Sequence, residues 1–290
     1  MTALFLGLFF FFRNLPSSEC GFLHYTEVYN PRTGETELCA VAPASFLDLV
    51  AHPFPLELVF EEKPEVVGQE GGWMNFQIKG PEGSMIEPGE IGITHTEKVH
   101  ILLVDAERSR YLHLHPEVSL GGSSFRLLLP ALGAGDWVMF AEFVPLRTRK
   151  MVMLRHAFSI EPSETAKPWG GRAMVADTRP SPNGLRLEKV GGGSLVAGRD
   201  QRMVLRVFPS DSLPVVDLEP VMDAYAHLVA FEDSLHGYIH MHPLAERLEA
   251  GRGGELDFLF HPPKRGSYQI WVQLQVNGEQ RYEAFWFEVG

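Results

Sequence analysis

One short phrase occurs twice in this 290-residue chain, as Tyr111-Leu112-His113-Leu114-His115-Pro116 and as Tyr238-Ile239-His240-Met241-His242-Pro243. Side chains on a β-strand alternate between its two faces. The two histidines of each copy therefore share one face with the tyrosine, and the apolar residues between them lie on the other. Proline after the second histidine suits the end of a strand, because proline cannot donate to the sheet ladder. The phrase predicts a strand that presents two histidines side by side, once in each half.

A third histidine precedes each copy of the phrase at a fixed distance. His100 lies thirteen residues before His113, and His227 lies thirteen residues before His240. An apolar run and a polar turn separate each upstream histidine from its phrase. If the turn closes a hairpin, the two strands pair and the third histidine comes close to the other two.

The rest of the chain repeats in the same order. The three histidines recur at an offset of 127 residues, whereas Phe125–Pro130 matches 256–261 and Gly135–Trp137 matches 266–268 at an offset of 131. An order of elements that survives a small insertion indicates two copies of one domain. The repeat length is typical of a compact domain.

Short strands separated by glycine and proline, with no helical period over several turns, predict an all-β protein of two tandem β-sandwiches. A Pro-, Ser- and Thr-rich stretch between the copies is typical of a linker. We expect five segments: a signal segment at 1–19, a lead-in at 20–54, a first β-sandwich at 55–161, a linker at 162–183 and a second β-sandwich at 184–290.

The N-terminal segment indicates export. Residues 3–12 form an apolar run too short to span a bilayer but of the length of a signal-peptide core, although no Lys or Arg precedes it. The two cysteines, Cys20 and Cys39, would then form a disulfide; the alternatives are two unrelated thiols or lipidation of Cys20. We expect a periplasmic or secreted protein of the cell envelope that is not an integral membrane protein.

The formal net charge of −12 argues against a nucleic-acid partner and against anionic membrane surfaces. No cysteine accompanies the histidines, which excludes a thiolate zinc site there. Three imidazoles on adjacent strands suit copper or zinc. His95 and the residue aligned with it, Met222, are added as candidate ligands.

Two other interpretations stay open. In the first, the histidines form a polar strand face, bonded to backbone carbonyls or to each other, in a non-metal structural or protein-interaction module. In the second, the chain is a metalloenzyme with an open coordination position. Carboxylates near the histidines, such as Glu97 and Glu117, are not repeated, and no phosphate loop or nucleophile elbow is present. We therefore assign no catalytic residue and expect a protein that is not an enzyme.

The first copy resembles the YtkA-like group of bacterial exported domains. The likeness lies in His95–Val104, in the Tyr111–Glu117 strand with its His-x-His-Pro-Glu motif, and in the closing strand Gly135–Pro145. The second copy, from Tyr225 to Pro243, is similar to a related exported variant. Thr96 stands where the group has glutamate, and Leu244 follows the second His-Pro where glutamate is usual. The resemblance implies an immunoglobulin-like or cupredoxin-like β-sandwich, a cell-envelope location and an association with copper or heavy metals.

Residues and resemblance together predict an exported metal-binding protein with one three-histidine site per repeat. Copper is the expected metal, with zinc as the alternative. The expected partners are the metal ion and other cell-envelope proteins. We expect the two sites to act independently and binding to weaken as the pH falls through about 6–7, because imidazole must be neutral to ligate.

Overall fold

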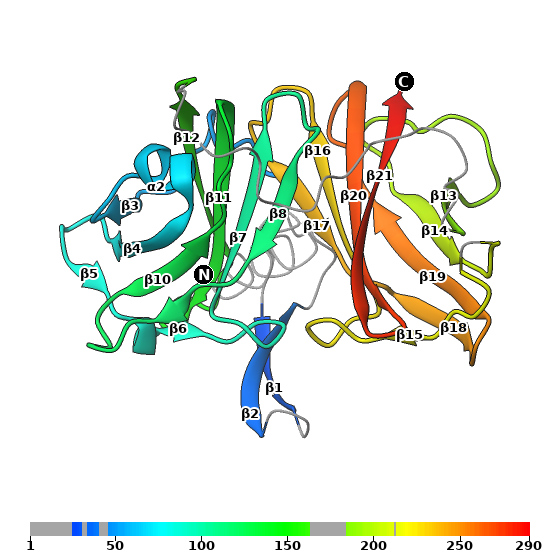
Figure 1. Ribbon diagram of the computed structural model, residues 1–290, viewed down its shortest axis with the longest axis horizontal. Helices are drawn as coiled ribbons and strands as arrows, with labels where there is room; N and C mark the ends of the chain where they lie inside the picture. Colours follow the sequence, from blue (N-terminus) through cyan, green and yellow to red (C-terminus); the bar gives the residue numbers. More distant parts are fainter. Residues whose placement is uncertain (1–24, 31–33, 41–45, 163–183, 212) are drawn as a thin grey trace, which may run out of the picture.

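The structure is a computed structural model that describes residues 25–30, 34–40, 46–162, 184–211 and 213–290 (Figure 1). The expected signal segment, Cys20 and the linker from residue 163 onward lie outside the described residues. The side chain of Cys39 lies outside them as well, and with it the expected disulfide. Among the described residues, no helix is long and apolar enough to cross a membrane.

The first half folds into two antiparallel sheets. Its elements are β3 (Glu57–Phe60), α2 (Pro64–Glu70), β4 (Gly72–Lys79), β5 (Met85–Ile86), η1 (Pro88–Glu90), β6 (Ile91–Gly92), β7 (Val99–Asp105), β8 (Tyr111–Leu114), β9 (Glu117–Val118), β10 (Phe125–Leu129), β11 (Gly135–Pro145) and β12 (Val152–Ile160). One sheet has the order β3-β4-β10-β9, with β5 beside β4; the other has the order β12-β11-β7-β8, with β6 beside β11. Apolar side chains of both sheets, such as Phe76 and Trp137, form one buried core between them.

The second half repeats this arrangement. Its strands are β13 (Leu185–Lys189), β14 (Gln201–Val207), β15 (Leu218–Glu219), β16 (His227–Glu232), β17 (Tyr238–Met241), β18 (Ala245–Glu249), β19 (Gly253–Phe260), β20 (Gly266–Val276) and β21 (Glu279–Val289). One sheet has the order β13-β14-β19-β18; in the other, β20 pairs with β15, β16 and β21, and β16 pairs with β17. The chain is therefore an all-β protein of two tandem β-sandwiches, as the sequence predicts. The short helix α2, which the sequence did not predict, packs beside β12 and β4.

Strands β7 and β16 are buried along their whole length. A strand covered on both faces needs an apolar residue at nearly every position, which explains the continuous runs around Leu102 and Val229. One face of each strand belongs to the core of its own sandwich. The other face packs against the opposite half.

The two histidine-bearing sheets pack face to face between the sandwiches (Figure 1). Their shared cluster of buried residues includes Leu102, Val104, Tyr111, Val138 and Phe140 from the first half and Val229, Phe231, Leu235, Tyr238 and Trp271 from the second. Equivalent positions of the two repeats meet here, because Tyr111 and Tyr238 differ by the 127-residue offset and Phe140 and Trp271 by the 131-residue offset. The interface thus resembles the self-complementary contact of a two-fold dimer, formed within one chain.

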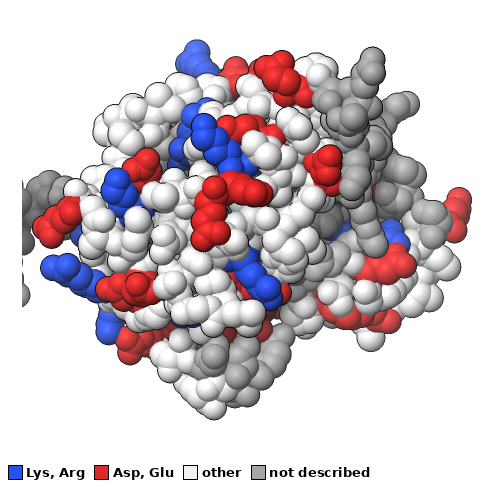
Figure 2. All heavy atoms as spheres, turned by 60° about the vertical axis from the view of Figure 1, so that its left-hand side comes forward, with Lys and Arg blue, Asp and Glu red and all other residues white. Residues whose placement is uncertain are grey.

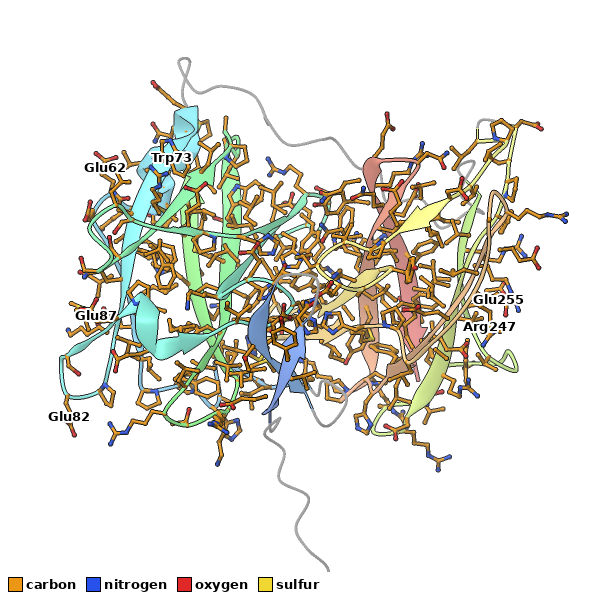
Figure 3. All side chains as sticks on the ribbon, turned by 90° about the horizontal axis from the view of Figure 1, so that it is seen from below. Glu62, Trp73, Glu82, Glu87, Arg247 and Glu255 are labelled. Carbon is orange, nitrogen blue, oxygen red and sulfur yellow. The ribbon has the colours of Figure 1, made fainter. Side chains whose placement is uncertain are left out.

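The lead-in, whose role the sequence did not reveal, bridges the two halves. Strands β1 (Tyr25–Asn30) and β2 (Glu35–Ala40) form a hairpin that projects between the sandwiches (Figures 1 and 3). At the other end of the lead-in, Leu49 joins the shared apolar cluster, and its N–H donates to the carbonyl of His236 (2.9 Å).

Charged side chains lie on the outer surfaces. Figure 2 shows acidic and basic groups interspersed over one side of the molecule. In Figure 3, Arg247 and Glu255 lie at the outer side of the second sandwich, where they form an ion pair of 2.9 Å. The centre of the molecule is occupied instead by the two histidine phrases and the apolar cluster.

Candidate metal centre

The hairpin expected from the polar turn places the first three histidines together. Strands β7 and β8 pair with Leu102 opposite His113 and Ile101 opposite Leu114, so His100 lies beside the end of the phrase. The Nδ1 atom of His100 is 3.1 Å from Nε2 of His113, and Nε2 of His115 is 3.3 Å from the same Nε2. We call His100, His113 and His115 the first triad.

The second half builds the same arrangement on β16 and β17. Val229 lies opposite His240, and Leu228 lies opposite Met241. His227 Nδ1 is 3.3 Å from His240 Nε2 and 2.9 Å from His242 Nε2. We call His227, His240 and His242 the second triad. In each triad one nitrogen of every ring lies within 4.8 Å of the corresponding nitrogens of the other two.

Hydrogen bonds outside each triad fix which nitrogen of the upstream histidine carries the proton. His100 Nε2 donates to the carbonyl of Thr94 (2.9 Å), and His227 Nε2 donates to the carbonyl of Val221 (2.8 Å). Both carbonyls sit at equivalent two-residue turns closed by bonds between residues 94 and 97 and between 221 and 224. A neutral imidazole has one donor and one acceptor nitrogen. The Nδ1 atoms of His100 and His227 therefore point lone pairs into their triads.

The first histidine of each phrase faces a polar side chain from across the interface. His113 Nδ1 lies 2.9 Å from Oε1 of Gln273, and His240 Nδ1 lies 3.6 Å from Oε2 of Glu142. The contact with Gln273 is a hydrogen bond, which places a proton on His113 Nδ1 and leaves Nε2 as a lone pair directed into the triad. The contact with Glu142 is longer than a hydrogen bond, but the nearby carboxylate favours a proton on His240 Nδ1. The hydrogen-bond partner of a ligating histidine commonly sets its tautomer in this manner.

Each triad consequently brings two imidazole lone pairs together. The third ring has one N–H to donate, so it can satisfy only one of these two lone pairs. A metal ion resolves this repulsion. With metal–nitrogen distances of about 2.0–2.1 Å, trigonal or tetrahedral ligands are separated by about 3.3–3.6 Å. The four short nitrogen contacts, from 2.9 to 3.3 Å, lie at or below this range, and the remaining pair in each triad lies within 4.8 Å. The donor set fits copper or zinc.

The two triads are not separated by the two-domain organisation. The rings of His113 and His240 have centroids 5.5 Å apart, and those of His100 and His240 are 6.1 Å apart. Because the histidine face of β8 faces the histidine face of β17, the six rings form one cluster between the sandwiches. The expectation of two independent sites is corrected accordingly. A cation in one triad acts electrostatically on the other.

Glu142 and Gln273 are functional candidates that the sequence alone did not reveal. They are aligned by the 131-residue offset, and each lies opposite the upstream histidine of its own half, His100 or His227. Each side chain then reaches a histidine of the other half. The available signal was the polar residue that both copies have at this aligned position, Glu142 between Ala141 and Phe143 and Gln273 between Val272 and Leu274.

The two added candidates lie at equivalent turn positions. His95 and Met222 both have positive φ, 50° and 48°. His95 lies outside the first triad and stacks against His242 of the second, with ring centroids 3.9 Å apart. Met222 is half-buried in the corresponding turn of the second half. His95 is thus placed to support the second triad from the first sandwich.

The hairpin of the lead-in joins these two turns. The side-chain amide of Asn30 donates to Glu37 (2.8 Å) and to Asp223 of the second half. The backbone N–H of Leu38 donates to the carbonyl of Ile93, just before the turn of the first half (2.7 Å). Residues 25–40 therefore tie together the two turns whose carbonyls hold His100 and His227.

Burial lowers the pKa of most of these imidazoles. Desolvation, with added repulsion from His240, lowers the pKa of His95 to about 4. Desolvation also lowers the pKa of His100 to about 4, and together with His100 it lowers that of His115 to about 3. The same causes lower the pKa of His113, His227 and His242 well below the ordinary value. Loss of ligands to protonation therefore moves below the expected window of pH 6–7.

The buried neutral histidines make the metal-free protein sensitive to acid. Below pH 6.5 the unfolded chain binds more protons than the folded chain, so the stability present above that pH is lost as the pH falls towards about 4. For His100 alone the loss reaches about 3 kcal/mol, at about 1.4 kcal/mol per pKa unit. We expect chelator-treated protein to show a falling free energy of unfolding in urea titrations between pH 7 and 4.5. A flat profile between pH 7 and 5 would contradict the burial of these rings, and replacing the exposed His52 by alanine should leave the profile unchanged.

Comparisons with known proteins concern the fold. The chain is similar to a DUF4785 family protein from Legionella pneumophila (12% identity, TM-score 0.23), covering 79% of this chain and 56% of that one. It is also similar to the D00-D0 domain of intimin (11% identity, TM-score 0.21; 80% of this chain, 98% of that one). A third similar structure is the FN1-FN3 region of chicken CNTN1 (8% identity, TM-score 0.21; 80% and 66%). The chain spans a little over half of the Legionella protein.

With TM-scores this low, none of these structures bears on function. No curated protein matches the chain. One family model matches part of it, and the matched residues hold the second triad. Residues 183–290 match the model of a domain of unknown function, DUF8832.

Proposed function

We propose that this protein binds transition-metal ions at its two histidine triads, and that copper is the metal it takes. The observation that carries the proposal is the convergence of imidazole nitrogens in both triads, oriented by hydrogen bonds to Thr94, Val221 and Gln273 and by the carboxylate of Glu142 beside His240. Imidazole ligands suit both copper and zinc. The resemblance of the first copy to YtkA-like exported domains supports copper.

The role proposed is binding rather than catalysis. His100, His113, His227 and His240 are at most 4% exposed, so little of either triad faces a substrate in solution. Such burial suits a protein that holds or passes on an ion. We place the protein in the cell envelope, where other envelope proteins would be its partners; this part of the proposal rests on residues 1–19 and on the resemblance.

Metal titration of the full chain tests the proposal. Protein purified without a histidine tag and treated with a chelator should bind up to two equivalents of Cu⁺ or Zn²⁺ per chain. Competition with a chelating dye gives the affinities, and metal analysis of the desalted complex gives the stoichiometry. Absence of binding of both ions would favour the rival interpretation, in which the six rings form a structural polar seam between two interacting β-sandwiches.

A further inference from the structure

The approximate two-fold symmetry of the histidine cluster is broken by charge at one pair of positions. Glu142 on β11 and Gln273 on β20 are equivalent by the repeat offset and by their pairing opposite His100 and His227. Glu142 carries a carboxylate towards the second triad, whereas Gln273 carries a neutral amide towards the first. The two triads therefore have the same ligands but different supporting groups.

The carboxylate of Glu142 is buried beside the second triad. The side chain of Glu142 is 8% exposed. Its polar contacts are the hydroxyl of Tyr238, which donates to Oε2 at 2.6 Å, and the ring of His240 at 3.6 Å. Among the described residues, no lysine or arginine forms an ion pair with it. The hydroxyl of Tyr238 donates to the carboxylate, an arrangement that favours its ionised form.

A buried anion is costly unless a positive charge lies close to it. A metal ion held by His240 supplies that charge through the imidazole ring. A carboxylate on the far nitrogen of a ligating histidine also makes the ring a stronger ligand, and loss of such a partner commonly weakens metal affinity by about 10–100-fold. The amide of Gln273 orients His113 but contributes no net charge.

We propose that the two triads are unequal halves of one centre between the sandwiches, and that Glu142 directs the first metal ion to His227, His240 and His242. The inference rests on the proposed function. The first bound ion then makes binding of the second ion less favourable. The rings of the two triads approach to 5.5 Å, and like charges at such distances repel. Glu142 acts as a positioning residue, through His240.

Zinc titration of two matched backgrounds tests the order of loading. His115→Ala removes a ligand of the first triad, and His242→Ala removes one of the second; neither residue contacts Glu142 or Gln273. We expect the triad left intact in His115→Ala to bind Zn²⁺ about 10–100-fold more tightly than the one left intact in His242→Ala. Adding Glu142→Gln should remove this advantage in the first background and leave the second nearly unchanged.

The reciprocal variant guards against a purely structural effect. Gln273→Glu in the His242→Ala background should tighten Zn²⁺ binding at the first triad, and thermal unfolding identifies any variant that does not fold. The ring of His95 lies closer to the second triad, 3.9 Å from His242, than to the first, 6.3 Å from His100, and this also makes the triads unequal. The response to Glu142→Gln therefore decides the inference rather than the ranking alone. Equal affinities in the two backgrounds, or an equal effect of Glu142→Gln in both, would overturn it while leaving the proposed function intact. A wild-type chain that binds no Zn²⁺ and no Cu⁺ would instead reject the proposed function.

Discussion

A chain with His113 and His115 both replaced by alanine is expected to bind one metal ion instead of two. The double substitution removes two of the three nitrogens of the first triad and leaves only His100 Nδ1. Losing a group that merely supports a ligand costs about 10–100-fold in affinity, so losing two ligands should abolish measurable binding there. Metal analysis after equilibrium dialysis against Cu⁺ or Zn²⁺ measures the change.

The matched variant is His240→Ala with His242→Ala, which should lose the ion of the second triad. The surviving ion should bind in a single step in either variant, because no second cation repels it. His52→Ala, at an exposed position away from the triads, serves as the control. If the His113→Ala, His115→Ala chain retains both equivalents at wild-type affinity, the first triad is a structural polar face.

The sequence was sufficient to predict the triads because their determinants are local. The alternation in Tyr111–His115 sets a common face for two histidines, and the polar turn after Val104 predicts the hairpin that adds the third. The structure confirms this pairing in both halves. Repetition in one register distinguished these six histidines from unrepeated ones such as His52 and His156.

The packing of one sandwich on the other could not be predicted in this way. Continuous apolar runs such as Ile101–Val104 indicate that both faces of a strand are buried. They do not indicate what covers the second face, because the partner lies more than a hundred residues away in the sequence. Phe231 and Tyr111 could equally have belonged to the cores of separate domains.

Glu142 and Gln273 could not be recognised from the sequence for the same reason. Glu142 and Gln273 act on histidines of the opposite half, so their meaning depends on the contact between the sandwiches. The lead-in was also uninformative, because its hairpin binds to the two turns through backbone groups and through Asn30 and Glu37 rather than through a recognisable motif. Long-range contacts of this kind require the structure.

Replacement of Phe231 by alanine is expected to lower the free energy of unfolding by about 3–5 kcal/mol, the usual cost of truncating a buried phenylalanine. Phe231 is fully buried in the shared cluster. Its ring lies 5.7 Å from that of Tyr111 and 5.9 Å from that of Phe140, both in the first half. The substitution therefore leaves a cavity between the sandwiches, and urea unfolding monitored by fluorescence measures its cost.

The same substitution should weaken metal binding at both triads, because the contact that it loosens holds Glu142 and Gln273 against His240 and His113. Phe258→Ala is the matched control, since Phe258 is equally buried but belongs to the core of the second sandwich alone. Phe258→Ala should lower the free energy of unfolding by a similar amount, and it should weaken Zn²⁺ binding less than Phe231→Ala does. A loss of under about 1 kcal/mol for Phe231→Ala, the range of a surface substitution, would mean that the sandwiches do not pack through this face in solution. The six histidines would then act as two separate sites.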